Sequence, residues 1–201
     1  MNRHVKVVIS GMEDGLRVES RVLEERIQGA LERGYRNIEI QAFGQHGIGG
    51  RLWKKGADPV KIDIYGYPGQ RIGSMGSSET SIEVHGPASD DVGWLNAGAT
   101  IVVHGDATNG VANAMAQGKI YIEGDIGARG MTMTKSNPRF APPELWVLGG
   151  VGDSFAEFMA GGVAVVCGLG SHYRGNILGH RPCVGMVGGK IFFRGIQKNF
   201  S

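Results

Sequence analysis

A short run of alternating apolar and polar positions that closes on a glycine is the most regular feature of the sequence. The run occurs eight times, at residues 40–44, 62–66, 82–86, 101–105, 120–124, 145–149, 164–168 and 191–195. Because side chains alternate between the two faces of a strand, each copy predicts a short strand with one apolar face.

A second pattern precedes the strands at a constant distance. The segments MAQG at 115–118, MAGG at 159–162 and MVGG at 186–189 each begin five residues before the first apolar position of the next strand. A further apolar position follows the closing glycine by six residues, at Ile72, Val92, Val111 and Phe155. Matching offsets of this kind indicate a structural repeat of about 20 residues.

A repeat of this length is too short for a propeller blade or a helical repeat, and it favours one coil of a parallel β-helix. We therefore expect an all-β fold, a single-stranded parallel β-helix of about eight rungs, because one coil cannot bury its own apolar row. The expected inward rows are Ile40, Ile62, Ile82, Ile101, Ile120, Leu145, Ala164 and Ile191, and then Ala42, Ile64, Val84, Val103, Ile122, Val147, Val166 and Phe193. An antiparallel sandwich with glycine-rich turns is the alternative.

The first 36 residues differ from the repeats. Residues 4–10 are typical of a strand, and residues 19–33 carry apolar side chains at helical spacing, with Gly34 as a stop. We expect a strand–helix cap over residues 1–36 and the repeats over residues 37–201, with longer excursions at 130–144 and 171–185.

Composition narrows the class of protein. Glycine provides 35 of the 201 residues, more than twice the usual share of about 7%, and the net charge is +2. Two cysteines are too few for a disulfide scaffold or for a four-thiolate iron–sulfur cluster. Since the chain shows no apolar run of membrane-spanning length, no signal-peptide pattern and no basic cluster, we expect a cytoplasmic protein that binds neither membrane nor nucleic acid.

Searches for catalytic or metal-binding motifs give weak candidates. The glycines at 47–50 and 149–152 lack the strand-then-helix setting of a dinucleotide site, and Ser154 lacks that of a nucleophile elbow. Two cysteines and two histidines fall within 17 residues, at Cys167, His172, His180 and Cys183, but their spacing matches no zinc motif. His85 and His104 occupy the same outward slot on adjacent strands, which we interpret as a solvated ladder. We expect no catalytic, cofactor-binding or metal-binding residue.

The outward residue at the middle of each strand changes character along the chain. The row reads Gln41, Asp63, Glu83, Val102, Tyr121, Trp146, Val165 and Phe192, so it is polar at first and apolar in its last five members. Large exposed apolar patches are rare on monomers. Either an excursion or the segment 196–201 covers the row, or Val102, Tyr121, Trp146, Val165 and Phe192 form an interface with another subunit.

The segments GQHGIG at 44–49 and GYPGQRIG at 66–73, together with the Met-x-Gly-Gly segments, carry a family resemblance. The sequence resembles the glycine-repeat (GXGXG) domain of glutamate synthase large subunits over about residues 17–197. The same domain type occurs in one of the subunits of formylmethanofuran dehydrogenase. The resemblance implies a right-handed β-helix.

In the synthase, an amidotransferase domain releases ammonia from glutamine, and a barrel domain with FMN and an iron–sulfur cluster converts 2-oxoglutarate to glutamate. The resemblance implies that this chain is a free-standing, non-catalytic subunit that holds those parts in register. The implied partners are separately encoded amidotransferase and FMN-binding subunits, which would carry the FMN and the cluster; the chain itself would carry no cofactor.

Two alternatives stay open. The chain is a subunit of a formylmethanofuran dehydrogenase-type complex, or it is a stand-alone protein, either a hydrolase using Ser154 or a homo-oligomeric binder. The neighbouring genes would separate the two complexes, and ester hydrolysis lost in Ser154→Ala would support the hydrolase.

Overall fold

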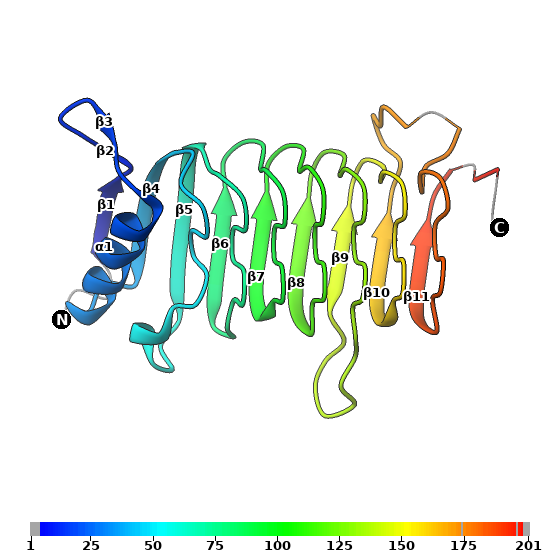
Figure 1. Ribbon diagram of the computed structural model, residues 1–201. Coiled ribbons are helices and arrows are strands. Elements are labelled where there is room, and N and C mark those ends of the chain that lie inside the picture. The colour runs from blue at the N-terminus through cyan, green and yellow to red at the C-terminus, as the bar shows by residue number, and fades with distance from the viewer. Residues whose placement is uncertain (1–4, 174, 196, 199–201) are drawn as a thin grey trace.

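The computed structural model describes residues 5–173, 175–195 and 197–198. His4, which we expected to begin the first strand, lies outside these residues. The elements in chain order are β1 (Lys6–Ser10), β2 (Met12–Glu13), β3 (Leu16–Arg17), α1 (Ser20–Glu32), β4 (Asn37–Phe43), the 3-10 helix η1 (Trp53–Lys55), β5 (Val60–Tyr67), β6 (Thr80–Val84), β7 (Ala97–Val103), β8 (Gln117–Ile122), β9 (Glu144–Val147), β10 (Ala160–Val166) and β11 (Gly188–Phe193). Figure 1 shows the larger strands side by side in one long row.

One nine-stranded parallel sheet organises the chain. Its order is β1-β4-β5-β6-β7-β8-β9-β10-β11, so every strand lies beside its neighbour in the chain apart from the small β2–β3 hairpin. Each of the strands β4 to β10 is followed by a return segment that crosses one face of the sheet before the next strand begins (Figure 1).

The expected all-β, single-stranded parallel β-helix is wrong. The described residues form an α/β-type arrangement, a nine-stranded parallel sheet with one α-helix, and no closed β-helix is found among them. The return segments are turns because they hold non-glycine residues at positive φ, such as Ala112 (59°) and Ala114 (53°), a conformation that strands exclude. Successive return segments meet through isolated parallel bridges such as Ala88↔Ala107 and Ala107↔Ile126.

The predicted alignment of the repeats is confirmed from β5 onward. Ile62 pairs in register with Ile82, and the row continues through Ile101, Ile120, Leu145, Ala164 and Ile191. The first copy is wrong by two residues, because Ile40 pairs with Ile64, Ile38 with Ile62, and Ala42 with Gly66. A shift of two residues keeps the same side chains inward, since strand side chains alternate.

The core lies between the sheet and the return segments. Inward residues of β4 to β10 are buried, and the return segments oppose them with Ile72, Val92, Val111 and Phe155, each 0% exposed. Each return segment also hydrogen-bonds the next; for example, the Ala112 N–H donates to Val92 O at 2.9 Å. At β11 burial weakens, since Phe193 is 37% exposed.

The glycine of the Met-x-x-Gly pattern allows a bulge at the start of a strand. In the β7–β8 pair the register shifts between Ala97 and Thr100, and Gly118 sits opposite with φ of +93°. A Cβ added to Gly118 would collide with the Ala99 carbonyl oxygen, so only glycine fits.

The amino-terminal segment closes one end of the core. α1 buries Leu23, Ile27 and Leu31, and Gly34 ends it with φ of +87°, as predicted. β1, which belongs to the expected cap, pairs with β4, the first strand of the repeats. The division into units 1–36 and 37–201 stays a prediction. In the part of the chain that the structure describes, no helix has both the length and the apolar character needed to cross a membrane.

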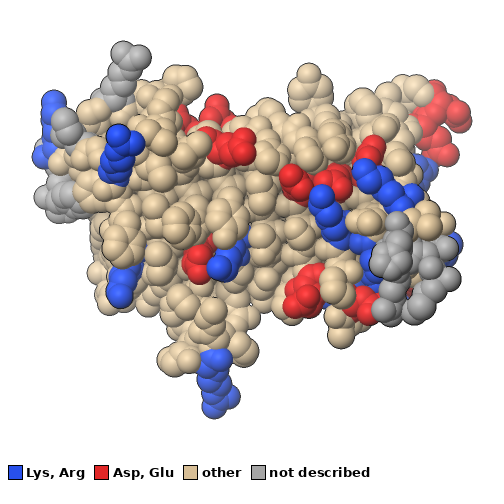
Figure 2. Space-filling view, turned by 180° about the vertical axis from the view of Figure 1, so that it is seen from behind, with Lys and Arg blue, Asp and Glu red and all other residues tan. Residues whose placement is uncertain are grey.

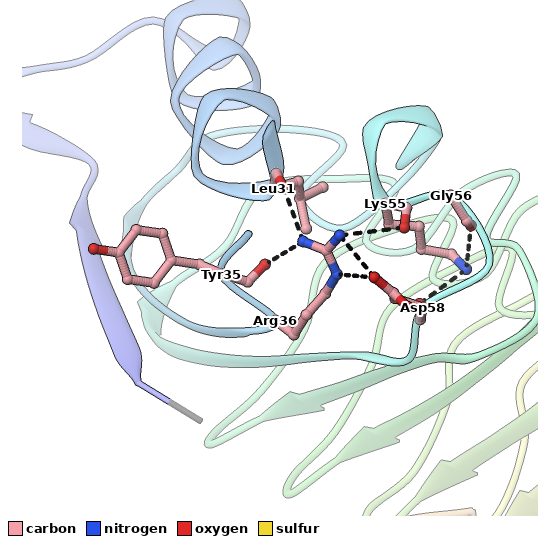
Figure 3. Close-up of polar contacts among 6 residues, drawn as sticks. All are labelled: Leu31, Tyr35, Arg36, Lys55, Gly56 and Asp58. Atoms are coloured by element: carbon pink, nitrogen blue, oxygen red, sulfur yellow. Dashed lines mark hydrogen bonds and ion pairs between the residues drawn. The ribbon is translucent and has the colours of Figure 1, made fainter. Parts of the chain in front are cut away.

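A half-buried arginine links the end of α1 to the loop after β4 (Figure 3). Arg36 donates from Nη1 to Leu31 O and Tyr35 O, both at 2.8 Å, and from Nη2 to Asp58 Oδ2 at 3.0 Å. The Lys55 ammonium donates to Gly56 O at 3.2 Å and to Asp58 O at 3.4 Å. These charged donors satisfy backbone carbonyls at the end of α1 and in the loop that follows η1.

Candidate functional site

The face of the sheet that points away from the core carries the candidate site. Its central row, here called the outer row, runs in register through Glu39, Asp63, Glu83, Val102, Tyr121, Trp146, Val165 and Phe192. Gln41, which we expected in this row, instead pairs with Tyr65, because the first repeat is shifted by two residues. The other seven members stand where the sequence pattern put them.

The five predicted interface residues lie next to one another in this row. Trp146 is 40% and Phe192 56% exposed, whereas Val102, Tyr121 and Val165 are half-buried. The Tyr121 and Trp146 rings stack with centroids 6.4 Å apart, and the Trp146 indole N–H donates to Glu144 Oε2 at 3.0 Å. The strand register therefore assembles one continuous apolar strip.

Neither excursion covers this strip. The segment before β9 and the segment before β11 project beyond opposite ends of the strands (Figure 1). Of the segment 196–201, Ile196 and residues 199–201 lie outside the described residues. Trp146 and Phe192 consequently keep about half of their surface open to solvent among the residues described.

The other half of the outer face is charged. Lys61 on β5 ion-pairs with Asp63 and Glu83, each at 3.2 Å, and Lys6 on β1 ion-pairs with Glu39 at 2.9 Å. Figure 2 shows the molecule from behind: charged side chains of both signs crowd its right-hand end and are sparser over its left-hand half.

Two histidines stand among these carboxylates. His85 Nε2 lies 3.0 Å from Asp63 Oδ1, and His104 Nε2 lies 2.9 Å from Glu83 Oε1. His104 Nδ1 lies 2.8 Å from Glu123 Oε1, so both nitrogens of this ring face a carboxylate. We call these five residues the histidine–carboxylate cluster.

The aromatic rings around the cluster stack on one another. Tyr65 lies parallel to His85, with ring centroids 4.2 Å apart and planes 4° apart, and the centroids of His85 and His104 are 5.5 Å apart. The stack follows from the parallel register, which places equivalent side chains of adjacent strands about 4.8 Å apart. It fixes the plane in which the His85 nitrogens point.

The electrostatics of the cluster follow from these contacts. Hydrogen bonds to Glu83 and Glu123 raise the pKa of His104, because they favour the charged imidazolium. Hydrogen bonds from His104 and then Lys61 lower the pKa of Glu83. For Asp63, burial opposes ionisation, but the contacts with His85 and Lys61 outweigh it and lower the pKa.

The two histidines and Glu123 on the next strand were recognised from the sequence, but the carboxylates of Asp63 and Glu83 were missed. Asp63 lies on the strand before His85, two residues ahead of the position equivalent to His85, and Glu83 is related to His104 in the same way. A comparison of adjacent copies with an offset of two residues would have found both carboxylates. Among the described residues, Glu83, His85 and His104 form the one group of three or more possible metal ligands whose ligand atoms all lie within 4.8 Å.

The second candidate metal site, with two cysteines and two histidines, does not form a cluster among the described residues. His172 contacts Asp125 instead of a cysteine, with Nδ1 at 2.9 Å from Oδ2, and Cys167, His180 and Cys183 do not gather with it. Burial raises the pKa of the Cys183 thiol, which favours its protonated form.

The glycine and serine candidates take up corner positions. Gly150 N–H donates to the buried Asp125 carboxylate at 2.6 Å, so the glycines at 149–152 form a turn around a protein carboxylate. Ser154 has φ of +57° within a return segment, and its backbone N–H donates to His180 O at 2.9 Å. This is a turn setting and differs from the strand-to-helix elbow of a nucleophilic serine.

Comparison with known proteins gives one family and several relatives. The family model described as the GXGXG motif matches residues 21–201. The ferredoxin-dependent glutamate synthase of Pyropia yezoensis is 27% identical over 186 residues, which cover 90% of this chain and 10% of that protein. The ferredoxin-dependent glutamate synthase 2 of Synechocystis is 26% identical over 178 residues, covering 86% of this chain and 10% of that protein.

A relative of similar size also exists. An uncharacterised protein of Methanocaldococcus jannaschii is 32% identical over 197 residues, covering 86% of this chain and 72% of that protein. The chain thus spans about a tenth of the length of the two synthases that it matches. No solved structure matches. The resemblance drawn from the glycine segments is confirmed, and the chain belongs to the GXGXG motif family, whose members include a segment of glutamate synthases.

Proposed function

We propose that this chain is a non-catalytic structural subunit of a glutamate-synthase-type complex. In this proposal it holds an amidotransferase part and an FMN-binding synthase part in register while they convert glutamine, 2-oxoglutarate and reductant to two glutamates. The two parts are separate polypeptides, and they carry the FMN and the iron–sulfur cluster. The family match and the two synthase relatives support the type of complex.

One observation carries the structural role: the apolar part of the outer row. Val102, Tyr121, Trp146, Val165 and Phe192 come from five consecutive strands and form a strip that the described residues leave open. Protein interfaces are enriched in aromatic residues at their centre, and buried aromatic residues carry much of their binding energy. Trp146 and Phe192 are therefore the expected anchors.

The parallel sheet suits a scaffold. Because its strands follow chain order and rest on one continuous core, positions on the outer row keep fixed spacings along its length. A rigid row of this kind can hold two partners at a constant separation. The known glutamate synthases place this segment within one long chain, and here we propose that docking replaces the covalent connection.

Co-purification tests the proposal. The tagged chain is expressed with the amidotransferase and FMN-binding subunits encoded in its own organism, and we expect all three to elute together. Trp146→Asp with Phe192→Asp should reduce recovery of at least one partner by more than tenfold, since central interface residues contribute about 2 kcal/mol or more each.

The matched control is Phe140→Asp. Phe140 is 56% exposed, like Phe192, but it lies in the excursion before β9 and outside the outer row. It should leave recovery unchanged, and circular dichroism should show intact strands in both the double variant and the control. If the unmodified chain recovers neither partner, the proposal is wrong; recovery with a molybdopterin-binding subunit would favour the formylmethanofuran dehydrogenase alternative.

A further inference from the structure

The histidine–carboxylate cluster has a feature that a simple row of surface ion pairs lacks. One ligand atom from each of Glu83, His85 and His104 lies within 4.8 Å of the other two. A tetrahedral zinc ion with bonds of about 2.1 Å holds its ligands about 3.4 Å apart. Small rotations of these side chains are enough to reach that separation, because the three residues come from two adjacent strands.

Charge favours a cation at this point. Asp63, Glu83 and Glu123 contribute three negative charges. Lys61 offsets part of this charge, since its ammonium group ion-pairs with Asp63 and Glu83, each at 3.2 Å. The Lys61 side chain is 48% exposed, so it can swing into solvent when another cation arrives. The side chains of Glu83, His85 and His104 are 27% to 33% exposed, which leaves an ion a route from solvent.

The surroundings pre-orient the two imidazoles. Asp63 holds Nε2 of His85, and Glu123 holds Nδ1 of His104, whose Nε2 faces Glu83, so each ring has one orienting carboxylate besides the proposed ligand. Metal-binding histidines are commonly held in this way, because the carboxylate fixes the ring and makes the other nitrogen a better ligand. Stacking of Tyr65 on His85 adds a second restraint.

We propose that Glu83, His85 and His104 bind one divalent transition-metal ion of the zinc type, with Asp63 and Glu123 as the carboxylates that orient the histidines. Imidazole nitrogens with a carboxylate oxygen suit zinc, cobalt or nickel better than magnesium or calcium, which prefer oxygen alone. The ion ties β6 to β7 and to Glu123 at the end of β8. This site is independent of the apolar strip and of the partners proposed above.

Isothermal titration of the chelator-treated chain with zinc chloride tests the site at neutral to mildly alkaline pH. We expect one saturable site per chain, lost in His85→Ala and in His104→Ala. Glu123→Gln should weaken the affinity about tenfold, as loss of an orienting carboxylate usually does. Lys61→Met should strengthen binding, because it removes the competing ammonium group.

His180→Ala is the matched control, since His180 is exposed and lies outside the cluster. Cobalt(II) gives a second readout, because a tetrahedral site with histidine ligands produces a much stronger visible absorption than octahedral hydrated cobalt does. Should a histidine variant fail to fold, Glu83→Gln, which keeps the side-chain shape, replaces it in the test. Absence of saturable binding, or equal binding by His104→Ala and His180→Ala, would overturn the proposal.

Discussion

In β4 to β6 the outer row holds the carboxylates Glu39, Asp63 and Glu83, which contact ammonium and imidazole groups from the same strand or from neighbouring strands. In β8 to β11 the same row holds Tyr121, Trp146, Val165 and Phe192, and two of these are left well exposed. We call these regions the polar half and the apolar half. Both halves share the same parallel backbone and the same inward aliphatic rows.

The difference shows that the two faces of each strand are under different constraints. The inward residues are nearly uniform because each must fill the same space between the sheet and a return segment. The outward residues are free of that constraint, so one half satisfies its own charges and the other leaves apolar surface open to solvent. The predictions below test this separation.

The largest effect is expected from an inward residue of the apolar half. Ile120→Ala should lower the free energy of unfolding by about 3 kcal/mol, because the side chain is fully buried and its removal leaves a cavity. Tyr121→Ala, at the adjacent outward position, should cost about 1 kcal/mol through its stacking with Trp146. Chemical denaturation measures both, and equal losses would mean that Tyr121 belongs to the core.

A medium effect is expected at Asp125, which ties the strand ends of the apolar half together. Its carboxylate accepts from Gly150 N at 2.6 Å and from His172 N at 2.9 Å. Burial opposes ionisation of Asp125, but these backbone donors outweigh it and lower the pKa. Asp125→Ala should cost about 2 kcal/mol, since buried donors lose their partner.

The pH dependence of the Asp125 effect has a defined sign. Because the pKa is lower in the folded than in the unfolded chain, where an aspartate titrates near 3.9, the stabilisation is fully present above about pH 5. It disappears as the pH falls through the folded pKa. The stability difference between the natural chain and Asp125→Ala should therefore shrink below about pH 4, and a constant difference would contradict the assignment.

Asp90 is the counterpart in the polar half and should show a smaller effect. It accepts from the Thr108 hydroxyl at 2.5 Å and from Asn109 N at 3.0 Å, and these two bonds lower its pKa. Because Asp90 is less buried than Asp125, Asp90→Ala should cost about 1 kcal/mol by the same denaturation measurement. A loss larger than that of Asp125→Ala would reverse the expected order.

The smallest effect is expected from the ion pairs of the polar half. Lys61→Ala should lower stability by less than about 1 kcal/mol, because half of the lysine side chain is exposed. Raising the salt concentration from about 0.1 M to about 1 M shortens the screening length from about 10 Å to about 3 Å and should remove most of that difference. A salt-independent loss would mean that Lys61 contributes through packing.

Much of the sheet could be predicted from the sequence because its strands repeat one apolar pattern. The glycine-closed runs located all eight repeated strands, and the row from Ile62 to Ile191 is aligned as expected. The first copy was misaligned because Gly66, the closing glycine of the second copy, pairs with Ala42, two residues before Gly44. A glycine marks a turn, but the number of residues between that glycine and the aligned part of the strand varies from copy to copy.

The fold class could not be predicted because the return segments carry little pattern. Their buried residues, such as Val111 and Phe155, were recognised, but the positive φ values that keep these segments as turns occur at ordinary residues such as Ala112 and Met131. Tertiary contacts impose these conformations, and intrinsic preference does not reveal them. The contacts of Asp63 with His85 and of Glu83 with His104 were missed for a related reason, since each carboxylate comes from the preceding strand.

Photo-crosslinking tests the separation of the two halves most directly. A benzophenone amino acid replaces Trp146 in one chain and Tyr65 in another, since both side chains are about 40% exposed on the outer face. We expect irradiation of the co-expressed complex to link position 146 to an amidotransferase or FMN-binding subunit and to leave position 65 without a product. Crosslinks of equal yield at both positions, or at position 65 alone, would contradict the account.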